Sequence, residues 1–110
     1  MIAPLVEAAL PEIRALCERY GVERMSLFGS ATTEKFSPET SDVDCLVKFF
    51  DSDKRGIVNR YWELTQGLEH TLQHPVDLLT ERSVKNPIFR DCLEQSKILI
   101  YESSNTKSLC

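Results

Sequence analysis

Residues 42–50, "DVDCLVKFF", place two carboxylates at alternate positions of a stretch that otherwise reads as a buried β-strand. Side chains alternate across a strand, so Asp42 and Asp44 are predicted to face one side while Val43 and Cys45 face the other. Carboxylates on a buried strand destabilise a fold unless a cation or a cationic side chain binds them. The segment therefore predicts a strand of a small sheet with a cation-binding face.

Length, composition and charge limit the class of protein. The chain has 110 residues, which suits one compact domain, and its 42% hydrophobic and 27% charged residues match a soluble globular protein. The formal net charge of −4 argues against direct nucleic-acid binding, but not against a phosphate ligand held through a metal. Neither a membrane-spanning run nor a signal peptide is recognised. We expect a cytoplasmic domain over residues 1–102 and a frayed tail over residues 103–110.

The cysteines do not form a metal-binding pattern. Four are present and none belongs to a CxxC pair, whereas zinc sites usually show close paired ligands. Cys17, Cys45 and Cys92 fall in apolar periodic segments and are predicted to be reduced and buried. Cys110 ends the polar tail and is predicted to be exposed.

Hydrophobic periodicity predicts three helical regions. Residues 4–21 have helical spacing with a break at Pro11, and Gly21 is a natural stop. Asn86 is predicted to cap a helix that begins at Pro87. The third region is an amphipathic helix, whose apolar face is formed by Ile57, Tyr61, Leu64, Leu68 and Leu72.

Four short strands are predicted at residues 24–29, 42–50, 75–80 and 97–102, with a helical turn after Gly29. The order of elements predicts an α/β (α+β) fold, in which helices pack against a small mixed sheet of about four strands. The helix between the second and third strands permits these two strands to be parallel.

A third acid extends the cation-binding pattern. If the strand that carries Asp77 neighbours the second strand, its carboxylate converges with those of Asp42 and Asp44 at one end of the sheet. Each pair of carboxylates would repel by roughly 4 kcal/mol at about 4 Å and an effective dielectric constant near 20. Protonation or a bound cation relieves this repulsion, and Mg²⁺ prefers oxygen ligands. Such a site suits two-metal phosphoryl or nucleotidyl transfer.

Gly29 and Ser30 follow the first predicted strand. A glycine lets a phosphate approach the backbone closely, and a helical turn at Ser30 would direct free N–H groups at that phosphate. The Ser30 hydroxyl can donate one more hydrogen bond. Metal-binding carboxylates that face such a turn suit a nucleoside triphosphate.

The combination of "LFGS", "SDVDCLVKF" and "VDLL" resembles the minimal nucleotidyltransferases of the DNA polymerase β-like superfamily. Their signature is Gly-Ser, then Asp-x-Asp, then a third Asp on a following strand. The resemblance implies a polymerase-β-like nucleotidyltransferase fold, ATP as substrate and two Mg²⁺ ions. It implies that Asp42 and Asp44 hold both metals, that Asp77 completes the site of the catalytic metal and helps to activate the acceptor hydroxyl, and that Gly29 and Ser30 hold the triphosphate.

The same resemblance implies a partner. Family members of this size are often antitoxins paired with a helical HEPN-domain toxin, a ribonuclease, and some silence it by attaching AMP to a tyrosine hydroxyl. The chain is therefore expected to be a protein adenylyltransferase of a toxin–antitoxin pair, within a homo- or hetero-oligomer and away from membranes.

The turn departs from the usual Gly-Ser-x-Ala-Arg-Gly, because Thr33 and Glu34 stand where the family has arginine and glycine. This departure favours an alternative function, a binding module of the same fold that masks its partner sterically with weak or absent nucleotide transfer. The three acids favour the enzyme. Candidate replacements for the arginine are Lys35, Lys48, Lys54 and Arg55.

Other conspicuous residues are interpreted as structural. His70 and His74 are four positions apart, but His74 precedes proline, so the helix is expected to end before it and a metal-binding pair is not favoured. Tyr61 is predicted to lie in the core. Trp62 is predicted to pack, with a partner surface as the alternative. Solvated charges are predicted at Arg82, Lys85 and Arg90.

Overall fold

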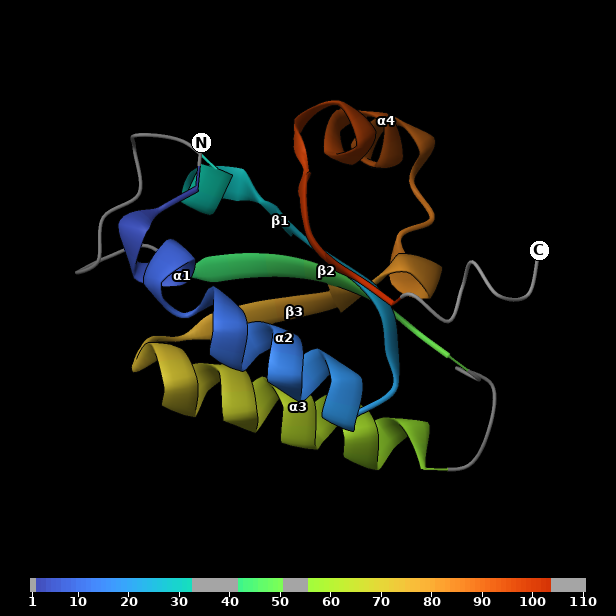
Figure 1. Cartoon of the computed structure of the whole chain (residues 1–110). Helices are drawn as coiled ribbons and strands as arrows, with labels where there is room; N and C mark the ends of the chain where they lie inside the picture. The colour runs from blue at the N-terminus through green and yellow to red at the C-terminus, as the bar shows by residue number, and fades with distance from the viewer. Residues whose placement is uncertain (1, 33–41, 51–55, 104–110) are drawn as a thin grey trace.

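A computed structural model describes residues 2–32, 42–50 and 56–103, which form a four-stranded sheet with helices on both faces (Figure 1). The strands lie in the order β3-β2-β1-β4. β1 is antiparallel to β2 and β4, whereas β2 and β3 are parallel. This mixed sheet confirms the predicted fold class. The strands are β1 (Val22–Phe28), β2 (Val43–Phe49), β3 (Val76–Thr80) and β4 (Ile98–Glu102).

Three helices, α1 (Pro4–Ala8), α2 (Leu10–Arg19) and α3 (Ile57–Leu72), cover one face of the sheet. The predicted break near Pro11 is present, because α1 ends before it and Pro11 occupies the first turn of α2, where proline is tolerated. Gly21, with a φ of +69°, follows α2 as predicted. None of the described helices is long and apolar enough to span a bilayer.

The main core lies between this helical layer and the sheet. Alternate residues of β2 enter it, so Val43, Cys45 and Val47 are at most 2% exposed, and α3 contributes Leu64 and Leu68. Cys17 and Cys45 are both buried and reduced, as predicted. Burial raises the pKa of the Cys17 thiol to about 12.

α4 (Pro87–Ser96) lies alone on the opposite face, over a small cluster of Phe28, Leu46, Val84 and Leu93. The predicted cap is present, because the Asn86 side chain accepts hydrogen bonds from the Ile88 and Phe89 N–H groups at 2.9 and 3.2 Å.

Three predictions need correction or completion. Cys92 is exposed rather than buried, since Leu93 is the one buried residue of α4. Trp62 is 62% exposed, so the predicted packing is wrong, whereas Tyr61 is partly buried against the core. Ser103, placed in the tail by the sequence, is buried, and its N–H donates to the Glu23 carbonyl at 2.8 Å. Cys110 lies outside the described residues.

Side chains of the helical layer bind backbone groups on both edge strands of the sheet. On β3, the Tyr61 hydroxyl donates to the Leu78 carbonyl, and the Val76 N–H donates to the Glu69 carboxylate at 3.1 Å. On β4, Arg14 Nε donates to the Ile100 carbonyl at 3.1 Å, where the register with β1 shifts. These contacts occupy edge groups that could otherwise pair with another chain.

Replacement of Tyr61 by phenylalanine tests this edge contact. Tyr61→Phe leaves the Leu78 carbonyl without its hydroxyl partner, so we expect a loss of about 1 kcal/mol in the free energy of unfolding by urea. Trp62→Phe, on the exposed side of the same helix, is the matched control and is expected to change stability by less than about 0.5 kcal/mol. Equal losses in the two variants would contradict the role of the hydroxyl.

Candidate active site

Two of the predicted acids lie side by side in the sheet. Asp44 and Asp77 are register partners on the parallel strands β2 and β3, and both side chains face the side of the sheet that α4 covers. Asp44 is half-buried and Asp77 is exposed. Asp42 lies one residue before β2 and is exposed. The acids therefore gather at one end of the sheet.

The electrostatics of Asp44 reflect this arrangement. Burial raises the pKa of the Asp44 carboxyl above its usual value, and the negative charges of Asp77 and Asp42 raise it further. Within residues 2–32, 42–50 and 56–103, no three His, Cys, Asp or Glu side chains are grouped closely enough to hold a metal ion. The structure thus pairs Asp44 with Asp77 and leaves Asp42 at the margin of the pair.

Gly29 brings the end of β1 against this acid pair. Phe28 is the register partner of Asp44, and the next residue, Gly29, has a φ of +68°. A Cβ atom at Gly29 would collide with the Asp44 carboxylate. The chain then forms the 3₁₀ turn η1 (Gly29–Thr32), in which the Thr32 hydroxyl donates to the Gly29 carbonyl at 2.8 Å. The predicted helical turn is present, with the Ser30 backbone inside it.

Two hydrogen bonds fix the strand on either side of Asp77. The Val76 N–H donates to Glu69 and the Leu78 carbonyl accepts from Tyr61, and both partners project from α3. Burial raises the pKa of the Tyr61 hydroxyl, and the charge of Asp77 adds to the effect. The helix that connects the two parallel strands therefore also positions the acid of β3.

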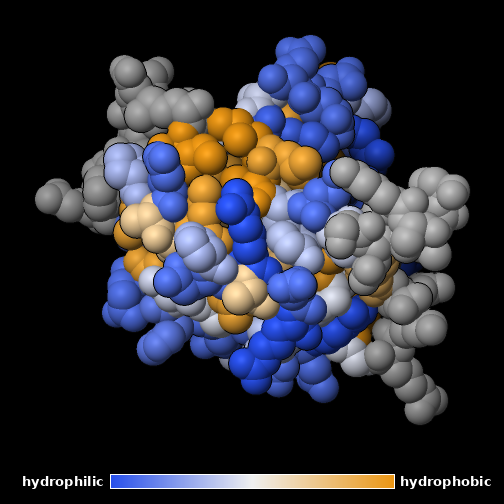
Figure 2. All heavy atoms as spheres, viewed as in Figure 1, coloured by the Kyte–Doolittle hydropathy of each residue, from blue (hydrophilic) through white to orange (hydrophobic). Residues whose placement is uncertain are grey.

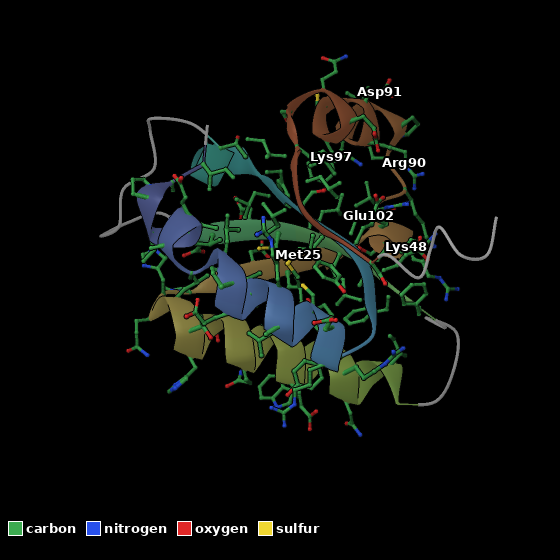
Figure 3. The ribbon with its side chains drawn as sticks, in the orientation of Figure 1. Met25, Lys48, Arg90, Asp91, Lys97 and Glu102 are labelled. Atoms are coloured by element: carbon green, nitrogen blue, oxygen red, sulfur yellow. The ribbon has the colours of Figure 1, made fainter. Side chains whose placement is uncertain are left out.

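Lys48, one of the candidate replacements for the missing arginine, does not reach this end of the sheet. Lys48, labelled in Figure 3, lies four residues along β2 from Asp44, roughly 13 Å away. Its ammonium pairs with Glu23 at 3.3 Å. Arg90 is exposed, as predicted, but its guanidinium donates to the Val84 carbonyl at 2.5 Å. Arg82 and Lys85 are exposed. The remaining candidates and the altered part of the turn, namely Lys35, Lys54, Arg55, Thr33 and Glu34, lie outside the described residues.

An ion pair that the sequence did not predict fastens this face of the sheet. Arg24 of β1 donates to both Glu81 carboxylate oxygens, at 2.7 and 2.8 Å, and so bridges β2 to reach η2 (Glu81–Ser83), which follows β3. Hydrogen bonding to Arg24 lowers the pKa of the Glu81 carboxyl. The partners are far apart in the sequence, so no local pattern indicates the contact.

The histidines do not form a metal-binding pair on one helix. α3 ends at Leu72, and Gln73 adopts a left-handed conformation after it. His70 is therefore on the helix, where it is exposed, while His74 lies beyond its end, as predicted.

Comparisons with known proteins identify the family. The family model of the nucleotidyltransferase domain matches residues 13–101. A candidate protein adenylyltransferase of Methanocaldococcus jannaschii is 33% identical over 87 residues, which cover 79% of this chain and 85% of the relative. The chain therefore belongs to the nucleotidyltransferase domain family, which confirms the resemblance seen in the sequence.

Solved structures agree with this assignment. The structure of a candidate minimal nucleotidyltransferase is 28% identical and superposes with a TM-score of 0.72, over 89% of this chain and 95% of that one. A complex of a tri-AMPylated HEPN toxin of Shewanella oneidensis with its MNT antitoxin contains a chain of the same fold. That chain is 21% identical and has a TM-score of 0.62, with 94% of this chain and 77% of that one covered.

Substitution of Gly29 tests the contact with Asp44. Gly29→Ala introduces both left-handed strain and a collision with the carboxylate, whereas Gly56→Ala introduces similar strain where nothing lies within 4 Å. We expect Gly56→Ala to cost roughly 1–2 kcal/mol of unfolding free energy, and Gly29→Ala to cost clearly more. Asp44→Ala in the Gly29→Ala background should remove the excess. Identical losses at the two glycines would show that the carboxylate is not in contact.

Neutralisation of Asp44 tests the repulsion. Because the pKa of Asp44 is raised in the folded state, the folded chain binds a proton more tightly than the unfolded chain. Stability should fall as the pH rises from about the ordinary value of 3.8 through the higher folded value. In metal-free buffer, Asp44→Asn should therefore raise the melting temperature by a few degrees at pH 7 and by much less below pH 3.8. Asp91→Asn, on the exposed surface of α4, is the matched control for the loss of one negative charge. An unchanged or lowered melting temperature for Asp44→Asn at pH 7 would contradict the repulsion between the carboxylates.

Proposed function

We propose that this chain is a metal-dependent nucleotidyltransferase that moves AMP, or another nucleoside monophosphate, from a nucleoside triphosphate to a hydroxyl of a partner protein. The observation that carries the proposal is the pairing of Asp44 with Asp77, with the Gly29 turn directly against Asp44. Membership of the nucleotidyltransferase domain family supports it.

The acid pair fits a divalent cation. Mg²⁺ typically takes one or two carboxylates and completes its shell with water and substrate phosphates, and Asp44 and Asp77 offer two adjacent ones. In this proposal Asp42, Asp44 and Asp77 hold two Mg²⁺ ions. When bound, the cations neutralise the triphosphate and the charge that develops during transfer.

The chain's own residues have three roles in the transfer. Gly29 and Ser30 bind the triphosphate through the turn η1, and the missing side chain of Gly29 leaves room for the Asp44 carboxylate beside that turn. Asp77 accepts the proton of the acceptor hydroxyl as the hydroxyl oxygen bonds to the α-phosphorus and the bond to pyrophosphate breaks. Asp44, between the turn and Asp77, aligns the two reactants.

The proposed acceptor is a HEPN-domain toxin, and the chain acts as its antitoxin. Two similar proteins support this choice. The relative in Methanocaldococcus jannaschii is a candidate protein adenylyltransferase, and a structure of the same fold is an MNT antitoxin in complex with a tri-AMPylated HEPN toxin. A small domain has little surface for a separate acceptor-binding module, so the partner is expected to bring its own hydroxyl to the acids.

A second candidate function is steric masking without transfer. The absence of arginine and glycine at positions 33 and 34 favours it, as does the lack of a three-ligand group among the described residues. In that case the partner is bound and silenced, and the carboxylates have no part in silencing.

Transfer of label from α-labelled ATP separates the two functions. The chain is purified with its co-expressed neighbouring protein and incubated with Mg²⁺, beside an Asp42→Asn, Asp44→Asn variant. We expect the wild type to label its partner and to silence the toxin. The double variant should transfer at least 100-fold less label and should not silence the toxin, although its complex with the partner remains intact. Asp91→Asn, on the exposed surface of α4, is the matched control and should transfer normally. Silencing that persists in the double variant, with no label in either sample, would refute the enzyme and establish masking.

A further inference from the structure

An aromatic pair stands beside the acid pair on the same face of the sheet. Phe28 is the register partner of Asp44, so the ring and the carboxylate are immediate neighbours across β1 and β2. Phe89, in the first turn of α4, holds its ring 6.4 Å from the Phe28 ring, centroid to centroid, at an angle of 78°. One continuous row thus runs from Phe89 through Phe28 and Asp44 to Asp77.

The two rings differ in their exposure to solvent. Phe28 is 8% exposed and belongs to the small cluster under α4, whereas Phe89 remains 42% exposed. The edge-to-face contact with Phe28 holds the Phe89 ring in place without covering it. Figure 2 shows hydrophobic surface between α4 and the end of the molecule where η1 lies. Phe89 is therefore an accessible aromatic surface on the order of 10 Å from the Asp44 carboxylate.

The position of Phe89 indicates which of the two reactants it meets. The Gly29 turn, which is proposed for the triphosphate, follows β1, whereas Asp77, which is proposed for the acceptor, lies two strands away on β3. Phe28 directly precedes that turn and Phe89 packs on Phe28, so the aromatic pair lies on the side proposed for the triphosphate and not on the side of Asp77.

We infer that Phe89 binds the base of the nucleoside triphosphate by stacking against the open part of its ring; the inference rests on the proposed nucleotidyl transfer. Stacking of a base on an aromatic side chain strengthens binding by roughly 5- to 150-fold. It tolerates every base, because each has a π face, but a purine offers the larger stacking surface. Phe89 thus determines affinity for the nucleoside part, and it favours ATP and GTP over CTP and UTP.

Replacement of Phe89 by leucine tests this role. Leucine keeps an apolar contact with Phe28 but has no π face, so the affinity for ATP in the presence of Mg²⁺, measured by calorimetry, should fall at least about 5-fold. KM for ATP should rise by a similar factor with kcat unchanged, and the preference for purines should shrink. Inorganic tripolyphosphate, which has no base, should bind the variant as it binds the wild type. Phe89→Trp should retain or strengthen ATP binding.

The matched control is Ile88→Leu, which alters the neighbouring residue of α4, 76% exposed. It should leave ATP affinity, KM for ATP, kcat, the purine preference and tripolyphosphate binding unchanged. Unaltered ATP affinity in Phe89→Leu, while the wild type transfers AMP, would overturn the inference and leave the proposed function standing. Equal losses of ATP and tripolyphosphate affinity, or a raised KM for the acceptor alone, would also overturn it. A wild type that neither binds ATP nor transfers AMP would remove the proposed function itself, and the inference with it.

Discussion

Two like charges held side by side form the constraint on which the rest of this structure depends. Asp44 and Asp77 are register partners, and none of the described Lys or Arg side chains forms an ion pair with either of them. Their neighbours Val43, Cys45 and Val76 point the other way, into the core beneath α2 and α3. A slip of one residue would bury the acids and expose the valines, so hydrophobic burial holds the register against the repulsion.

The repulsion is tolerable because of where it lies. Asp77 and Asp42 are exposed, so water screens their charges, and only Asp44 is partly desolvated. Gly29 allows the end of β1 to approach Asp44 without a side chain between them. α3 acts twice, since it connects β2 to β3 in parallel and also binds the backbone on both sides of Asp77. The same helix therefore builds part of the core and holds the strand that carries Asp77, so the core and the acid pair depend on each other.

Local patterns in the sequence predicted those parts that local geometry determines. Alternation placed Asp44 on the face opposite Val43 and Cys45, and turn residues located the helix ends near Pro11 and Asn86. Whether β3 lies beside β2 depends on contacts across the whole sheet, so the convergence with Asp77 could be stated only as a condition.

The errors have a related cause. Cys92 has a helical spacing that suggests burial, and Trp62 is a large aromatic residue beside the apolar stripe of α3. What covers a helix face is nevertheless decided by the neighbouring elements. Phe89 carried no signal for the same reason, because an aromatic residue in an amphipathic helix resembles any core residue until its partner Phe28 is known.

A protein of net charge −4 must bind a triphosphate without help from its overall field. In the proposed nucleotidyl transfer, that attraction would come from cations on the acid pair and from the backbone of η1, and the aromatic surface inferred at Phe89 would add affinity that requires no charge. Under that proposal, binding of the nucleotide with its cations would also relieve the repulsion between Asp44 and Asp77, so the folded chain would gain stability as it acquires its substrate.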